Sequence, residues 1–414
     1  MTFKFYLSKV GTIKNILLNL TDIHHNIDFE FHTYLKIPED NWDKEKQRPG
    51  NIYLKKNKKL NEKLDFIKIK ITEYIAERRL QGKTFTKQGI AKEIQRVSEE
   101  KPHGLSENSL LFLMQNYIHN KKDLLCNSTY KRYKVFFNLF QRFEGFMKKH
   151  FSITEINSDF VKNFLLFGRN EEYSENTIYR TIHFVKTILN FAERKGIRTH
   201  VQELELRREK QRKEIVTLAE SEILKIRYTD VPEELQAAKD WLLISCYTGQ
   251  RFSDFMQFST EKLREINGRI CISFTQQKTQ KDILLPLHPI VLGVVEKNGN
   301  SFPKIMDIHH YNTAIKQIAK LAGLNSTLKA NKRTGHRTRS RLTEKWQILS
   351  SHIGRRSFAT NFYGKIPTPL LMEATGHSTE QMFLKYINPI DKDRIVSLSN
   401  YFDKMSKESI LIKD

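Results

Sequence analysis

The sequence predicts a mainly α-helical protein with small β-sheets, and three observations lead to this expectation. Apolar residues recur at helical spacing through most of 106–197. Short runs of β-type residues open the chain, and two more follow Asn267-Gly268, a dipeptide that favours tight hairpins. We therefore expect an α+β N-terminal domain, an all-α central domain and a mainly helical C-terminal domain with a small antiparallel sheet.

The length and the net charge of the chain limit the class of protein to which it can belong. The chain has 414 residues, enough for two or three domains, and its 27 Phe residues can build several cores. It carries 70 Lys and Arg against 47 Asp and Glu, a net charge of +23. Such an excess usually reflects a polyanionic partner, with nucleic acid the first candidate, although the charge alone does not exclude a merely basic soluble protein.

Two further features concern the cellular compartment. No apolar run approaches membrane-spanning length, and the first residues lack a signal-peptide core, so we expect a cytoplasmic protein with no membrane partner. Cys126, Cys246 and Cys271 are widely spaced among apolar or strand-like neighbours, which predicts reduced core residues and no metal-ligand spacing.

The N-terminal domain is expected at 1–100. Its β-type runs are "FKFYL", "KNILLNL" and "FHTYLKI", and the turn-rich "PEDNWDKEKQRPGN" ends them. A basic amphipathic helix follows from about Lys58 to Leu80. This arrangement suits a nucleic-acid-binding arm, and a plain α+β module fits the same pattern.

The central helical domain is expected at 106–198. One of its helices places five aromatic residues on one face, and we interpret them as core and not as a base-stacking surface: Tyr133, Phe136, Phe137, Phe140 and Phe143. A later helix is expected to stop at Gly196. A linker is expected at 199–214, because 207–214 is a charged stretch without apolar residues.

The C-terminal domain is expected at 215–400, followed by a tail at 401–414. The pattern Thr217 to Glu220 predicts a capping box at its first helix, and Ser378 with Gln381 predicts another near its end. The segments "RICISF" and "ILLPL" predict a strand pair, and "RLTEKWQIL" (341–349) a further strand. Helices are expected to resume from about His352.

Several cationic side chains of this domain are candidates for binding an anion. Arg251 follows the expected helix stop at Gly249, where its guanidinium could bind two phosphate oxygens or pair with Asp254. Lys278 is expected at the tip of the strand pair, with Lys281 as a competing candidate. Arg355 is expected on a buried helix three residues after His352, without an acidic neighbour, so it needs a carboxylate or a phosphate from elsewhere.

In chain order these residues form a longer pattern. It consists of Thr248-Gly249-Gln250-Arg251, Lys278 with Pro286, His352 with Arg355, Gly376-His377-Ser378, and Tyr386 nine residues after His377. This pattern closely resembles the tyrosine recombinase (phage integrase) family over most of 215–400. The block at 106–197 resembles that family's core-binding domain, and 1–100 more loosely its arm-binding domain.

Two positions depart from the family pattern. Arg356 stands where the family often has His, and Gly354 lowers the intrinsic stability of its helix by ~1 kcal/mol relative to Ala. The spacing from Lys278 to Pro286 favours Lys278 over Lys281 for the catalytic role.

The resemblance implies a site-specific recombinase or integrase of a mobile element, which cuts and rejoins DNA through a 3′-phosphotyrosine without ATP, metal or cofactor. Tyr386 would be the nucleophile, Arg251 and Arg355 would bind the non-bridging oxygens, and Lys278 would be the general acid. His352 would assist proton transfer and His377 would hydrogen-bond the phosphate.

The resemblance also implies partners: double-stranded DNA at core and arm sites, a homotetramer on synapsed DNA, and host DNA-bending or directionality factors. The expected location is the bacterial cytoplasm, at the nucleoid. A type IB topoisomerase and a catalytically silent DNA-binding accessory protein stay open as alternatives.

Overall fold

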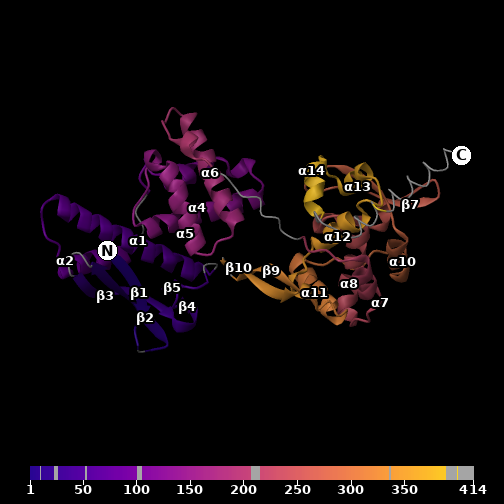
Figure 1. Cartoon of the computed structure of the whole chain (residues 1–414), viewed down its shortest axis with the longest axis horizontal. Coiled ribbons are helices and arrows are strands. Elements are labelled where there is room, and N and C mark those ends of the chain that lie inside the picture. Colours follow the sequence, from indigo (N-terminus) through magenta and orange to yellow (C-terminus); the bar gives the residue numbers. More distant parts are fainter. Residues whose placement is uncertain are drawn as a thin grey trace. The chain divides into compact units, whose positions relative to one another are not determined.

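The computed structural model describes residues 1–9, 11–22, 27–51, 54–99, 105–206, 215–334, 337–387 and 399. The chain divides into two compact units, Met1–Glu209 with Asn331–Arg339 and Lys210–Ala330 with Ser340–Asp414 (Figure 1). The expected charged linker segment 207–214 and the tail 401–414 lie outside the described residues. In the part of the chain that is described, no helix is long and apolar enough to cross a membrane.

The first unit begins with an antiparallel sheet of β1 (Thr2–Leu7), β2 (Ile13–Asp22) and β3 (Ile27–Pro38), in that order, which confirms the expected β-type runs. Phe5 pairs with Leu18, and Leu18 with Phe31. All three are buried against α1 (Lys55–Leu80) and α2 (Lys87–Glu99), drawn beside the sheet in Figure 1. A short ladder of β4 (Trp42–Asp43) and β5 (Arg48–Pro49) lies in the turn-rich segment, where no strand was expected.

Four helices follow in the same unit: α3 (Leu110–Asn120), α4 (Asn127–Met147), α5 (Ser158–Asn170) and α6 (Glu175–Glu193). The aromatic stripe of α4 is core, as expected. Phe140 and Phe143 are fully buried, and the ring of Tyr133 stacks on Phe184 with centroids 4.4 Å apart. Val201 and Leu204, at the start of the expected linker, are also buried in this core.

Cys126 corrects one expectation. It is the residue before α4 and is exposed, with its Sγ 3.3 Å from Ser128 Oγ and 3.2 Å from Thr129 Oγ1. These hydroxyl contacts lower the pKa of the Cys126 thiol to about 7. Cys246 and Cys271 are buried, as expected. The apolar neighbours of Cys126 did not reveal that it stands at a helix start on the surface.

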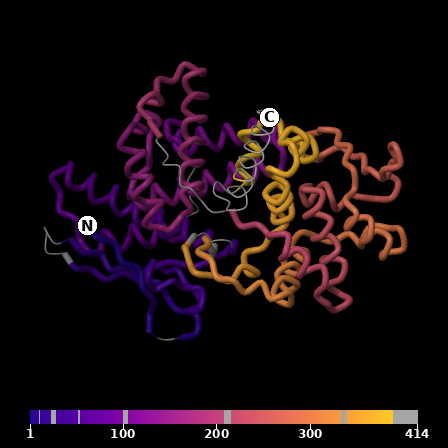
Figure 2. The backbone as a smooth tube through the Cα atoms, turned by 45° about the vertical axis from the view of Figure 1, so that its right-hand side comes forward, coloured from indigo at the N-terminus to yellow at the C-terminus, as the bar shows by residue number. Residues whose placement is uncertain are grey.

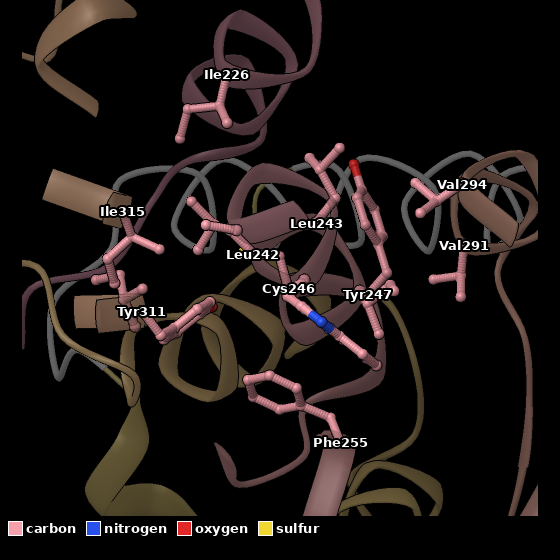
Figure 3. Packing of buried hydrophobic residues seen from close by; sticks show 14 of the residues in the cluster. Ile226, Leu242, Leu243, Cys246, Tyr247, Phe255, Val291, Val294, Tyr311 and Ile315 are labelled. Atoms are coloured by element: carbon pink, nitrogen blue, oxygen red, sulfur yellow. The ribbon is translucent and has the colours of Figure 1, made fainter. Parts of the chain in front are cut away.

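The second unit is built around α8 (Glu233–Thr248), which is buried along nearly its whole length. Around it pack α7 (Glu220–Tyr228), α10 (Pro289–Lys297) and α11 (Ile308–Leu321). Figure 3 shows Leu242, Leu243, Cys246 and Tyr247 of α8 pointing in different directions into this core. A helix that is buried on all sides gives a fixed support for the residues at its end.

A three-stranded antiparallel sheet of the order β6-β7-β8 lies in this unit: β6 (Leu263–Ile266), β7 (Arg269–Thr275) and β8 (Asp282–Pro286). Asn267 and Gly268 turn the chain with φ of +48° and +72°, which confirms the predicted hairpin signal. Strands β9 (Thr327–Thr334) and β10 (Arg337–Glu344) pair with each other. The strand expected over 341–349 is therefore only partly right, because Lys345–Ile348 form the 3-10 helix η7.

The end of the described chain returns to α8. It comprises α12 (Ile353–Phe362), α13 (Thr368–Thr375), α14 (Glu380–Phe383) and the 3-10 helix η8 (Leu384–Tyr386). Helix α12 packs against α8, although the two are far apart in the sequence (Figure 2).

Both predicted capping boxes were misplaced. Helix α7 begins at Glu220, and the N–H of Ala219 donates to the Glu222 carboxylate over 2.8 Å. The N–H of Leu218 donates instead to Ser357 Oγ of α12, a tertiary contact that local sequence does not reveal. Near the chain's end the capping residue is Thr379, whose Oγ1 accepts from the N–H of Met382 over 3.3 Å.

Candidate active site

The polar residues of the site follow the C-terminal ends of helices α8 and α13, and a glycine stands at each of these ends. Gly249 follows the last residue of α8 as its C-terminal cap with φ +67°, and Gly376 follows that of α13 in the same way with φ +71°. A Cβ at Gly249 would lie 2.5 Å from the Phe358 ring, and one at Gly376 would lie 2.5 Å from Gln276 Oε1. Backbone conformation and space therefore both require glycine where the chain turns towards Arg251 and His377.

Arg355 lies at the centre, with an exposed fraction of 0%. Its Nη1 donates to the carbonyl of Gly249 over 2.9 Å, and its Nη2 to that of Thr375 over 2.7 Å. Nη2 also lies 3.1 Å from Nε2 of His377. Its buried Nε has no hydrogen-bond partner among the described residues. The guanidinium therefore joins the ends of α8 and α13.

The carboxylate or phosphate expected for Arg355 is not supplied by a neighbouring acid: within the described chain, no carboxylate lies within ion-pair distance of it. Burial and the nearby charge of Arg251 lower the pKa of Arg355 to about 10. The guanidinium stays protonated at neutral pH, held by carbonyl groups and an imidazole.

Gly354 explains how α12 approaches α8 so closely. A Cβ on Gly354 would lie 2.0 Å from Ser245 Oγ and 2.7 Å from the Ser245 carbonyl carbon. The residue that weakens the helix locally is thus the one that allows α12 to place Arg355 against the end of α8.

His377 is held in one tautomer. Its Nε2 faces the Nη2 of Arg355, which only donates, so Nε2 is the acceptor. Its Nδ1 then carries the proton and donates to Thr375 Oγ1 over 2.7 Å, while that hydroxyl donates to the carbonyl of Leu371. Burial and the charges of Arg355, Arg251 and Lys281 lower the pKa of His377 to about 3. The imidazole is therefore neutral at physiological pH.

Tyr386 is half-buried at the end of η8. Its ring centroid lies 5.1 Å from that of His377 and 5.5 Å from Cζ of Arg355. Thr360 Oγ1 of α12 donates to its carbonyl over 3.2 Å, which ties η8 to α12. The structure thus brings Arg355, His377 and Tyr386 together.

Arg251 stands immediately before the short helix α9 (Phe252–Phe255). Its Nη1 donates to Gln276 Oε1 over 2.9 Å and lies 3.7 Å from Asp254 Oδ2. The pairing with Asp254 that the sequence left open is therefore present, as a long contact. Its charge still reaches Arg355 and His377, because it lowers the pKa of both groups.

His352 and Lys278 complete the expected set at the surface. His352 is exposed and stands immediately before α12, and Lys278 is exposed in the turn between β7 and β8. Partial shielding from water and four cations, Lys278 among them, lower the pKa of His352. Lys281 is half-buried, and its charge acts on His377. The field of each lysine therefore acts on a different histidine.

Sequence reasoning missed two polar residues of this site. Gln250 and Gln276 are both fully buried, and Gln276 Nε2 donates to Gln250 Oε1 over 3.1 Å. The only signal was a polar residue inside the TG-x-R pattern, and nothing in the sequence pairs it with Gln276. Among the described residues no group of three or more His, Cys, Asp or Glu is placed to hold a metal ion.

Comparisons with protein families match three parts of the chain. The model of the "Phage integrase family" matches residues 206–393, that of the "Phage integrase SAM-like domain" 109–203, and that of the "Arm DNA-binding domain" 14–91. No curated protein matches the sequence significantly.

Solved structures share the fold at low sequence identity. A lambda integrase dimer bound to a COC′ core site is 17% identical, covers 67% of this chain and 95% of its own, and has a TM-score of 0.50. The Tn1549 transposon integrase with circular intermediate DNA is 15% identical, covers 70% and 99%, and scores 0.51. XerH site-specific recombinase bound to palindromic difH substrate is 14% identical, covers 82% and 97%, and scores 0.51.

Proposed function

The chain belongs to the phage integrase family of tyrosine recombinases, and from this premise we propose how it cuts and rejoins DNA strands at specific sites. One observation carries the assignment of residues: Tyr386 lies beside Arg355 and His377, with Arg251 close enough to lower the pKa of both neighbours. A phenol next to a guanidinium and a neutral imidazole, with the charge of a second guanidinium acting on both of them, suits attack on a phosphodiester.

In the proposed reaction Oη of Tyr386 attacks the phosphorus of the scissile phosphate. The Oη–P bond forms, the P–O5′ bond breaks, and the products are a 3′-phosphotyrosine and a free 5′-hydroxyl. Arg251 and Arg355 bind the non-bridging oxygens, where negative charge increases in the transition state. The ester conserves the energy of the broken bond, so a second 5′-hydroxyl can reverse the step and reseal the strand.

Proton transfers involve the remaining residues. Lys278 donates a proton to the leaving 5′-oxygen, and its exposed position in the β7–β8 turn lets it reach bound DNA. His352, whose pKa is lowered, is neutral at pH 7 and accepts the phenolic proton. In the tautomer assigned above, Nε2 of His377 carries no proton. A hydrogen bond from His377 to a phosphate oxygen therefore requires Nη2 of Arg355 to turn away and the imidazole proton to move from Nδ1 to Nε2.

The division of labour along the chain is also part of this proposal. Residues 1–100 bind arm-type DNA, 106–198 form the core-binding domain and 215–400 the catalytic domain. The partner is double-stranded DNA, since the chain carries a net charge of +23. Four protomers assemble on synapsed DNA in the bacterial cytoplasm, with host DNA-bending factors, and the element served is a mobile one.

The test is a nicked suicide substrate built from DNA that the full-length protein selects from genomic fragments. Wild type forms a covalent adduct, which denaturing gels detect, and Tyr386→Phe forms none while it retains DNA binding. Tyr228→Phe is the matched control, because Tyr228 is exposed on α7 away from the site. An adduct that persists in Tyr386→Phe contradicts the assignment.

The two alternatives give different outcomes in the same assays. Relaxation of supercoiled plasmid without strand exchange identifies a topoisomerase. Specific binding without any wild-type adduct identifies a DNA-binding accessory protein.

A further inference from the structure

Gln276 is a neutral side chain at the crossing point of three segments that carry proposed catalytic residues. Its exposed fraction is 0%, and every polar atom of its amide is engaged. Oε1 accepts from Arg251 Nη1 over 2.9 Å and from Thr279 Oγ1 over 2.6 Å. Nε2 donates to Gln250 Oε1 and to the carbonyl of Thr375, each over 3.1 Å.

Gln250 extends this network to the two helix ends. Its Nε2 donates to the carbonyl of Thr248 over 2.8 Å and to that of Ala374 over 2.7 Å. The two amides therefore connect the last turn of α8, which precedes Arg251, with the last turn of α13, which precedes His377. A fully satisfied buried network of this kind fixes one arrangement of its members.

Gln276 also anchors the hairpin that carries Lys278. Its backbone N–H donates to the carbonyl of Lys281 over 2.8 Å, and its own carbonyl accepts from the N–H of Gln280 over 2.9 Å. The bond from Thr279 Oγ1 reaches into the same turn. The base of the Lys278 turn is thus held by the backbone of Gln276, and the side-chain amide that holds Arg251 also binds Thr279 of that turn.

An amide at this position differs from a carboxylate in one decisive way. A carboxylate of the same shape would form an ion pair with Arg251 and reduce its attraction for a phosphate. It would also turn an oxygen towards Gln250 Oε1 and the Thr375 carbonyl, where two hydrogen bonds are now donated. Asp254, the charged group already near Arg251, is 3.7 Å away. The amide holds the guanidinium without adding a negative charge to that of Asp254.

We propose that Gln276 is a positioning residue for DNA cleavage. It fixes the positions of Arg251, the Lys278 turn and the His377 turn relative to one another, and, unlike a carboxylate, it adds no second negative charge to that of Asp254 beside Arg251. This inference rests on the proposed function.

Three substitutions distinguish the effect of a charge at position 276, the effect of losing the hydrogen bonds of Gln276, and the effect of a charge merely near this position. Gln276→Glu keeps the shape and adds a charge against Arg251, whereas Gln276→Met keeps the size and removes the hydrogen bonds. Gln277→Glu is the matched control, since it adds the same charge one residue along at an exposed position. Each full-length variant is assayed for DNA Kd, for melting temperature, and for the single-turnover rate of adduct formation at saturating DNA.

Gln276→Glu is expected to slow adduct formation about 100-fold, the scale of losing one oxyanion donor, with DNA Kd within about threefold of wild type. Gln276→Met is expected to slow adduct formation less than Gln276→Glu does, and to lower the melting temperature by at least as much. A merely structural role would not give the larger rate loss to the variant whose melting temperature is no lower. The inference is overturned if Gln276→Glu is as fast as Gln277→Glu, or if rate losses follow melting temperature across the variants.

Thr279→Val covers the case in which neither Gln276 variant folds. It removes one bond to Oε1 from an exposed residue, and a rate loss of about 3- to 10-fold at unchanged Kd is expected. An unchanged rate overturns the inference. Absence of any adduct with wild type is a different result, because it overturns the proposed function and the inference with it.

Discussion

Gly354→Ala is the substitution for which helix propensity and tertiary packing predict opposite effects on stability. Gly354 lies within α12, and its φ is outside the positive range, so alanine would favour the helix by ~1 kcal/mol. Its Cβ would, however, lie 2.0 Å from Oγ, 2.6 Å from Cβ and 2.7 Å from the carbonyl carbon of Ser245. Rotation of the Ser245 side chain relieves only the first of these contacts.

The remaining contacts involve the backbone of α8, so α12 has to move away from it. Overpacking of this kind costs about 1–3 kcal/mol, and because backbone is involved we take the upper part of that range. After the gain in propensity, the expected net loss is about 1–2 kcal/mol of unfolding free energy. The same movement lengthens the 2.9 Å bond from Arg355 to the Gly249 carbonyl, so adduct formation falls as well.

Gly293→Ala is the matched control. Gly293 lies within α10 of the same unit, and nothing lies within 4 Å of the position of its added Cβ. Propensity alone then acts, and a gain of about 0.5–1 kcal/mol is expected. Urea unfolding followed by tryptophan fluorescence measures both variants, with Trp241, buried in α8, as the reporter of this unit after Trp42 and Trp346 are replaced by Phe. A Gly354→Ala protein as stable as Gly293→Ala would refute the reasoning.

Three further predictions concern single groups. Lys278→Ala is expected to slow cleavage about 10²–10⁴-fold, because the leaving 5′-oxygen loses its proton donor. A substrate with sulfur at the 5′-bridging position should restore the rate, since a thiolate leaves without a proton. The assignment is contradicted if Lys278→Ala loses as much rate on both substrates, or if the sulfur substrate rescues Lys281→Ala and not Lys278→Ala. The pKa of His377 is about 3 when folded against an ordinary 6.5, so the unfolded chain binds the proton first and stability falls as pH drops from 6.5 towards 3. The loss of unfolding free energy caused by this one group approaches ~1.4 kcal/mol per pH unit. Urea unfolding at pH 7.5, 5.5 and 4.5 should therefore show unfolding free energy falling less steeply with pH for His377→Gln than for wild type. The same steepness in both proteins would argue against the lowered pKa of His377. The pKa of the exposed Cys126 thiol is about 7 and that of the buried Cys246 thiol about 12, so Cys126 is the more reactive thiol. Iodoacetamide at pH 7.5 should therefore alkylate Cys126 first in the native protein, as measured by mass spectrometry. Preferential labelling of Cys246 would contradict this order of reactivity.

The sequence predicted the helical and strand segments wherever periodicity or turn residues were strong. Strand β9 was missed because Thr327–Thr334, "TLKANKRT", has too few apolar residues to show an alternating pattern. The misplaced start of α7 has a tertiary cause, since the Leu218 N–H bonds to Ser357 and not to a local cap.

For the site, the sequence motif predicted the charged residues, but it did not predict the contacts that fix their positions. From the sequence, Gly354 is only a residue that destabilises its helix. Its role in close packing follows only from the short distance between the position of an added Cβ and Ser245 of α8. Gln250 and Gln276 are 26 residues apart and belong to different elements, so no local pattern pairs them. Residue types are visible in a motif, whereas the contacts between segments depend on the folded backbone.

The way Arg355 is held has a consequence for handling the protein. Its described partners are two peptide carbonyls, a neutral imidazole and the side chain of Tyr386, and no described carboxylate forms an ion pair with it. Together with Arg251, whose charge acts on it, Arg355 is expected to bind tetrahedral oxyanions even without DNA. A ligand that binds only the folded state raises unfolding free energy by about 2.7 kcal/mol at a hundred times its Kd. Phosphate and sulfate buffers are therefore expected to act as competing ligands, and thermal stabilities measured in them should exceed those measured in a buffer without such anions.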